Sequence, residues 1–174
     1  DIADKQKQEK ILKNVLENDE IPAITTPYFN FFELDVLCQM GKLTEVLDKI
    51  RSYWGGMLDL GAVTFWEEYH PSVPKEEQYD MYGDHFGKSL CHAWAASPIY
   101  FLAKYFAGLD LVNKDGVTYI LKPQMQYFTE LDCTLPVGSN GVVRLVWDGE
   151  ILEITPNADG GILELGEERI SLVR

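Results

Sequence analysis

The chain has 174 residues, and 46 % of them are hydrophobic, which is enough to bury a core either as one domain or as a helical part plus a small β part. Its 28 acidic residues outnumber 15 basic ones, for a formal net charge of −13. That balance argues against binding to nucleic acid or to an anionic membrane, because neutralising phosphates requires a basic patch. No apolar run is long enough to span a bilayer.

The cysteines and histidines show no spacing that is typical of a metal site. The three cysteines are odd in number, far apart and set in apolar surroundings, so we predict buried free thiols: Cys38, Cys91 and Cys133. His70, Asp84 and His85 lie in one region but lack the spacing of metal ligands. We therefore expect no metal and no cofactor.

The first hundred or so residues have helical periodicity. Helices are predicted for Asp4–Asn18, Pro27–Met40 and Thr44–Leu58, followed by a helical stretch from Ser89 to Ala107 that Ser97 and Pro98 either kink or divide in two. Thr26 and Thr44 are the expected N-caps. The Pro27–Met40 helix is apolar nearly all round, which predicts burial on most of its sides.

A loop and a β-rich region complete the organisation. Residues Tyr69–Lys88 have no strong period and contain two prolines and two glycines, so they are predicted to form a long loop. After Gly108 short strands are expected between Gly-containing turns, with Met125–Leu135 as a further strand pair or an irregular return. The expected strands are Val117–Leu121, Val142–Trp147, Glu150–Thr155, Ile162–Leu165 and Arg169–Val173. This change of character, between Leu109 and Asn113, predicts a helical domain 1–109 and an antiparallel β-sandwich 110–174.

The segment Gly61–Tyr69 is the candidate site, because it places two carboxylates beside a tryptophan between two helical segments. Carboxylates bind sugar hydroxyls, and a carboxylate held against an apolar wall can take part in acid–base catalysis. The alternative is structural: a Trp-Glu pair is commonly a core tryptophan followed by a surface glutamate. Glu68 is interpreted as the solvated neighbour of Glu67.

Five elements, in this order, resemble the C-terminal half of bacterial α-L-rhamnosidases, the inverting family with an (α/α)6-barrel (six-hairpin) catalytic domain. They are Thr26–Phe29, Ile50–Asp59, Gly61–Glu67, Ser89–Trp94 and Ser97-Pro98. The resemblance covers nearly the whole chain, and T-x-W-E followed by S-x-x-H is its most specific part. It implies an α+β fold: the C-terminal portion of an (α/α)6 barrel followed by an antiparallel β-sandwich.

Carried over residue by residue, the resemblance makes Glu67 the general base that activates water. His92 would contact the sugar, and Trp66 would line the same subsite or stand just behind its wall. His92 could equally be a satisfied core residue, since neutral imidazole can donate one hydrogen bond and accept another in either setting. Trp54 and Trp94 are predicted to contribute to barrel packing. Tyr28 is assigned to the core, and Trp147 to the core of the sandwich.

An inverting glycosidase also requires a general acid, and nothing before Thr26 resembles the acidic motif that supplies it in the family. An (α/α)6 barrel further requires about a dozen helices, far more than the four or five predicted. With Asp1 rather than Met first, the chain is expected to be a C-terminal piece of a longer enzyme, inactive alone. It should pack against the remaining N-terminal part or associate with itself.

Other functions stay open at this point. The substrate implied is a rhamnose-containing oligosaccharide or glycoside. Another (α/α)6 glycosidase, of the trehalase or α-glucosidase kind, is the nearest alternative. Tyr69, where the family commonly has a more tryptophan-rich segment, leaves the sugar preference open. A non-catalytic carbohydrate-binding module is the alternative from another class. The compartment, whether cytoplasmic, periplasmic or secreted, is not indicated by the sequence.

Overall fold

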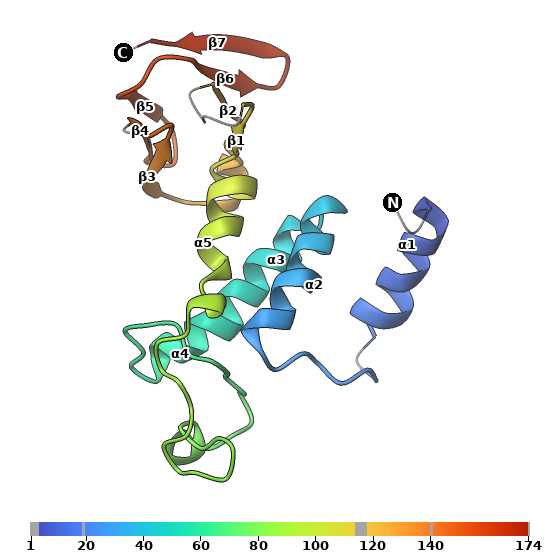
Figure 1. The fold of residues 1–174 in the computed structure, drawn as a ribbon. Helices are drawn as coiled ribbons and strands as arrows, with labels where there is room; N and C mark the ends of the chain where they lie inside the picture. The colour runs from blue at the N-terminus through green and yellow to red at the C-terminus, as the bar shows by residue number, and fades with distance from the viewer. Residues whose placement is uncertain (1–3, 19, 114–117, 140, 174) are drawn as a thin grey trace. The chain divides into compact units, whose positions relative to one another are not determined.

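The computed structural model describes residues 4–18, 20–113, 118–139 and 141–173. They form two compact units, residues 1–97 and residues 98–174, and each is described by itself. The first unit is helical with a long loop, and the second contains all the strands (Figure 1). Within the described residues no helix is long and apolar enough to cross a membrane.

The helices of the first unit follow the predicted periodicity closely. They are α1 (Lys5–Ile11), which continues as a π-helical turn over Leu12–Leu16, α2 (Pro27–Gln39), α3 (Leu43–Lys49) and α4 (Gly55–Asp59). A π-helical turn over Ile50–Trp54 joins α3 to α4, so these two run on as one helical segment (Figure 1). Short 3₁₀ turns at Lys75–Glu77 and Ala93–Ala95 interrupt the loop region.

The boundaries of α2 and α3 confirm one predicted cap and correct the other. Thr26 is the N-cap residue of α2, with Pro27 in the first turn, although the threonine side chain makes no capping hydrogen bond. Lys42, rather than Thr44, is the N-cap residue of α3. The reason is Gly41, whose φ of +75° reverses the chain after α2 and lets the next helix begin directly at Leu43.

Helix α2 is buried on one side only, which corrects the prediction of burial on most sides. Asn30, Leu34, Leu37 and Cys38 are buried. The opposite side leaves several large apolar residues exposed, with Phe29 58 % and Phe32 51 % accessible. The assignment of Tyr28 to the core is also wrong, since its side chain is exposed. The described helices of this unit are too few to cover α2 all round.

The predictions for buried tryptophans and cysteines hold in part. Trp54 is buried and its indole Nε1 donates to the carbonyl of Ala95 at 2.8 Å, as expected of a packing residue. Trp94, in contrast, is 52 % exposed. Of the cysteines only Cys38 is fully buried, because Cys91 lies on an exposed loop segment and Cys133 is half-buried; all three are free thiols.

Helix α5 (Ser97–Phe101) begins at the last residue of the first unit and continues into the second, where a π-helical turn over Leu102–Phe106 follows. Ser97-Pro98 therefore begin a helix. The strands are β1 (Leu109–Leu111), β2 (Tyr119–Leu121), β3 (Leu131–Val137), β4 (Gly141–Trp147), β5 (Leu152–Pro156), β6 (Gly161–Leu165) and β7 (Glu168–Leu172). Met125–Tyr127 is a 3₁₀ turn before β3, so the predicted Met125–Leu135 region combines a turn with one strand. Strand β1 lies where the sequence predicted a domain boundary.

Two sheets share one hydrophobic core. One sheet has the order β1-β2-β6-β7 and the other β3-β4-β5. Tyr119 and Leu163 of the first sheet and Val143 and Leu145 of the second belong to the same buried cluster. All pairings are antiparallel except β2 with β6, which is parallel and corrects the expectation of a purely antiparallel sandwich. Trp147 is only half-buried, its Nε1 donating to the carbonyl of Phe128 at 3.1 Å.

The compact units divide after Ser97, whereas the sequence predicted domains 1–109 and 110–174. The segment between the two positions packs with the β unit: Ala107 is part of the shared core, and the ring of Phe106 contacts those of Tyr127 and Phe128 at 5.7 and 5.8 Å between centroids. The domain assignment itself stays a prediction.

Candidate active site

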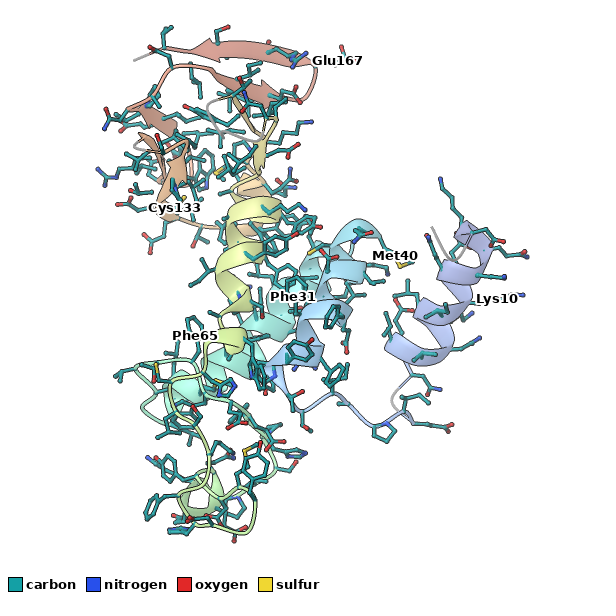
Figure 2. All side chains as sticks on the ribbon, viewed as in Figure 1. Lys10, Phe31, Met40, Phe65, Cys133 and Glu167 are labelled. Carbon is teal, nitrogen blue, oxygen red and sulfur yellow. The ribbon has the colours of Figure 1, made fainter. Side chains whose placement is uncertain are left out.

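Two segments of the first unit, Thr64–Glu67 and Ser89–His92, lie side by side in opposite directions. The amide of Glu67 donates to the carbonyl of Ser89 at 2.9 Å, and the amide of His92 donates to the carbonyl of Phe65 at 2.8 Å. The Thr64 hydroxyl donates to the carbonyl of Leu90. Phe65, labelled in Figure 2, marks the first of the two segments. The T-x-W-E and S-x-x-H motifs are therefore one structural unit.

This pairing corrects the prediction of a helix starting at Ser89. Residues 89–92 form no helix, with bends at Leu90 and Cys91, and Ala93–Ala95 form a short 3₁₀ turn before α5. The Ser89 amide, at the predicted start of the helix, instead donates to the Glu67 side chain.

Glu67 is a buried carboxylate with a donor on each oxygen. Its residue exposure is 8 %. The Tyr82 hydroxyl donates to Oε1 at 2.9 Å, and the Ser89 amide donates to Oε2 at 3.1 Å. A carboxylate has about four acceptor positions on its two oxygens, so each oxygen retains capacity for one further donor. The predicted alternative, a surface glutamate, is contradicted by this burial.

His92 lies next to the same carboxylate. Its Nδ1 is 3.8 Å from Glu67 Oε2. The imidazole also contacts the indole of Trp94, with 4.1 Å between ring centroids, and Trp94 in turn contacts the ring of Tyr28 at 5.4 Å. His92 is thus neither isolated in the core nor far from Glu67. The exposed rings of Tyr28 and Trp94 extend the apolar surface beside it.

Trp66 is almost fully buried, with 3 % exposure. Its ring packs edge-on against Tyr79 of the long loop, with 5.7 Å between centroids. The role predicted for Trp66 in the sugar subsite stays a prediction.

The electrostatic surroundings keep Glu67 ionised. Burial by itself raises the pKa of this carboxyl, but the hydrogen bonds from the Ser89 amide and the Tyr82 hydroxyl, with the charges of His92 and Lys88, outweigh it. The net pKa of Glu67 lies below the ordinary glutamate value. The bond to Glu67 also raises the pKa of Tyr82, which keeps its hydroxyl protonated as a donor. A carboxylate ionised at neutral pH and able to accept a proton has the form that a general base requires.

Sequence reasoning missed Tyr82, Lys88 and the role of the Ser89 amide. Lys88 is a buried lysine beside Glu67, and burial lowers its pKa. Tyr82 reaches Glu67 from a tight turn in the long loop, where Met81 and Asp84 exchange two backbone hydrogen bonds of 2.9 Å. Gly83, the residue after Tyr82, was the available signal for a turn there.

No metal centre accompanies these residues: in the part of the chain that the structure describes, no group of three or more His, Cys, Asp or Glu side chains could hold an ion. The imidazole Nδ1 of His85 lies 2.5 Å from Asp80 Oδ1 on the loop surface.

Two solved structures to which this chain is similar are rhamnosidases. No protein-family model matches the sequence, and no curated protein does. Among solved structures, a GH78 family rhamnosidase of Bacillus sp. GL1 superimposes with a TM-score of 0.71 and 25 % identity, over 91 % of this chain and 17 % of that one. A rhamnosidase from Klebsiella oxytoca, with rhamnose bound, matches with a TM-score of 0.50 and 34 % identity, over 59 % of this chain and 20 % of that one.

The chain has a rhamnosidase-like fold. The match to the Bacillus enzyme extends over nearly all of the chain. The rhamnosidase-like chain spans about a fifth of the length of either structure. A whole rhamnosidase accordingly contains several times more polypeptide than these two units provide.

Proposed function

We propose that this chain supplies the general base, Glu67, to an inverting glycoside hydrolase that acts on terminal α-L-rhamnosides. The observation that carries the proposal is the environment of Glu67: a buried, ionised carboxylate with one donor on each oxygen and a histidine 3.8 Å away, in a rhamnosidase-like fold. In the reaction, the remaining acceptor capacity of Glu67 takes a proton from a water molecule as that water attacks the anomeric carbon.

His92 is proposed to hold the sugar in the same subsite. Its ring lies between the Glu67 carboxylate and the exposed indole of Trp94, so a sugar hydroxyl hydrogen-bonded to the imidazole would sit within reach of both. The apolar ring of Trp94 is suited to cover the C–H side of a deoxy sugar. Trp66 supports this arrangement from behind through its packing on Tyr79.

The general acid is proposed to come from helices outside these 174 residues. In an inverting glycosidase the acid and the base stand roughly 6.5–9.5 Å apart, which leaves room for the attacking water. The small share of each rhamnosidase that the chain covers and the uncovered apolar side of α2 both support a missing partner, the remaining part of the same enzyme. The 174-residue chain alone is then expected to hydrolyse nothing.

The test compares the complete enzyme with its Glu67→Gln variant for release of an aryl group from an α-L-rhamnoside. Gln keeps the shape and loses the basicity, so kcat should fall by about a hundredfold or more. Glu68→Gln is the matched control, an adjacent carboxylate that should leave kcat nearly unchanged. Near-normal activity in Glu67→Gln would show that the base is elsewhere.

A second variant, Glu67→Ala, tests on which face of the sugar ring Glu67 acts, as well as its role as a base. In Glu67→Ala a small anion such as azide can replace the activated water, and it should restore turnover and yield the β-L-rhamnosyl azide, the product of attack on the face that Glu67 serves. Wild-type enzyme that ignores rhamnosides but cleaves α-glucosides or trehalose would favour the other (α/α)6 glycosidases. Rhamnose binding without hydrolysis by the complete enzyme would favour a carbohydrate-binding module.

A further inference from the structure

The loop between the two motifs holds one residue in an unusual conformation. Tyr82 has a φ of +55°, and among the described residues it is the only non-glycine residue with positive φ. Its neighbour Gly83 has φ +81°, so the two form the centre of a tight turn with a left-handed residue at each position. Asn-Gly is the sequence that normally fills such a turn, because asparagine tolerates positive φ and tyrosine does not.

Packing does not account for the tyrosine at this place. Its side chain is 83 % exposed, so hydrophobic burial does little to compensate for the backbone conformation. The contact that the structure does provide is polar: the phenol hydroxyl donates to Glu67 Oε1 at 2.9 Å. Strained backbone of this kind persists where the surrounding structure enforces it, and it is concentrated at functional sites.

The loop is ordered and holds the turn firmly. The Gln78 side chain, 1 % exposed, donates to the carbonyls of His70 and Val73 at 2.7 and 2.8 Å. On the other side of the turn, the amide of Lys88 donates to the carbonyl of Tyr79 at 3.1 Å. Gly87 passes so close to the Met81 carbonyl that a Cβ there would overlap it. The position of Tyr82 is therefore determined by the fold of the loop.

We propose that Tyr82 is a positioning residue for the base, which fixes the Glu67 carboxylate through Oε1 and leaves its remaining acceptor capacity for the attacking water. This inference rests on the proposed function of Glu67. The Ser89 amide holds Oε2 in the same way, so the two donors together determine the orientation of the carboxylate. The long loop thus contributes directly to the active site through its Tyr-Gly turn.

The charge balance around Glu67 agrees with this role. The groups that act on the carboxylate are the Ser89 amide, the Tyr82 hydroxyl, His92 and Lys88. A donor to the ionised form lowers the pKa of a carboxyl, so removal of the Tyr82 hydroxyl raises the pKa of Glu67. The base then becomes protonated at a higher pH on acidification, and the acidic limb of the activity profile moves upward.

The experiment follows the Glu67 carboxyl carbon by NMR during a pH titration of the 174-residue chain, with Glu67→Gln to assign the signal. The midpoint should rise in Tyr82→Phe, and should stay at the wild-type value in Tyr79→Phe, which removes a hydroxyl from the same loop without touching Glu67. An unchanged midpoint in Tyr82→Phe would overturn the proposal.

Tyr82→Asn separates positioning from folding. It places the favoured Asn-Gly pair in the turn, so the melting temperature should equal or exceed that of the wild type, whereas the Glu67 midpoint rises as in Tyr82→Phe. If Tyr82 served the loop only, Asn would leave the midpoint unchanged, and that result would contradict the proposal.

In the complete enzyme, Tyr82→Phe should lower kcat/KM at the optimum by about tenfold or less and shift the acidic limb to higher pH. If the acidic limb does not move in Tyr82→Phe, the role of Tyr82 is overturned, even if Glu67→Gln is inactive. If Glu67→Gln stayed active, the proposed function would fail instead, and the NMR midpoints would still report whether Tyr82 holds the carboxylate. The two failures are therefore distinguishable.

Discussion

The two units of this chain differ in the size of the apolar side chains that they bury completely. In the β unit Tyr119, Leu121, Val143 and Leu145 are fully buried. In the helical unit α2 exposes more than half of Phe29, and the ring of Tyr28 contacts those of Phe29 and Phe32 on the same uncovered side. The β unit therefore buries large apolar side chains completely between its sheets, whereas α2 leaves a group of contacting aromatic rings exposed.

The tighter core and the candidate site lie in different units. The candidate site lies in the helical unit, on loop segments, where binding and catalytic residues are commonly found. The β unit contains the tighter core and no residue assigned to the site. The predictions that follow test this comparison, from the largest expected effect to the smallest.

The largest effect is expected in the core of the β unit. Leu145→Ala removes a fully buried side chain between the two sheets and should lower the free energy of unfolding by about 3 kcal/mol, because it leaves a cavity. Amide hydrogen exchange along β4 would measure the loss. Ile151→Ala, at a 60 % exposed position of the same unit, is the control and should change the stability by less than about 0.5 kcal/mol. Equal losses would show that the β core is loosely packed.

A smaller effect is expected next to the candidate site, at two adjacent glycines of α4. A Cβ at Gly56 would overlap the ring of Tyr69, so Gly56→Ala should cost about 1–3 kcal/mol. Gly55 faces open space, and Gly55→Ala should instead stabilise the helix by about 0.5–1 kcal/mol. Urea denaturation followed by tryptophan fluorescence would compare them. Effects of the same sign would mean that Tyr69 does not pack against α4 as described.

The next prediction concerns an unsatisfied amide in α2. Asn30 is fully buried, and neither Nδ2 nor Oδ1 bonds to any described residue. Asn30→Ala removes this amide and improves the helix propensity, so we expect a gain of about 1 kcal/mol in the unfolding free energy of the chain. Thermal denaturation would measure it. A loss of stability would indicate that the Asn30 amide makes a compensating interaction. The helical unit would then satisfy its buried groups more fully than the exposed side of α2 suggests.

The smallest effect on stability is expected on the uncovered side of α2. Phe29→Ser should change the unfolding free energy of the 174-residue chain by less than about 0.5 kcal/mol, because the ring is 58 % exposed. It should nevertheless reduce self-association in sedimentation velocity, since large exposed apolar faces promote contacts. In contrast, Leu34→Ala on the buried side of the same helix should cost about 3 kcal/mol. A large loss in Phe29→Ser would contradict the one-sided burial of α2.

Local pattern alone predicted much of the fold. The 3.6-residue period predicted the α3–α4 segment, and Thr26-Pro27 and Gly41 marked the two ends of α2. The Gly-containing turns after Gly108 separated most of the strands correctly. These features depend on neighbours in the sequence, so the sequence shows them directly. The pairing of β2 with β6 does not, because a parallel contact between distant strands leaves no local signal.

For the candidate site, the sequence by itself determined which side chains could do the chemistry, and the resemblance it carries pointed to Glu67, His92 and Trp66. Only the tertiary structure decided that the two motifs lie side by side, with His92 3.8 Å from the Glu67 carboxylate and Trp66 buried. Tyr82 lies 15 residues after Glu67, and its contact depends on a tight turn within an ordered loop. Such contacts arise because folding brings distant segments together, and no period in the sequence encodes the distance between them.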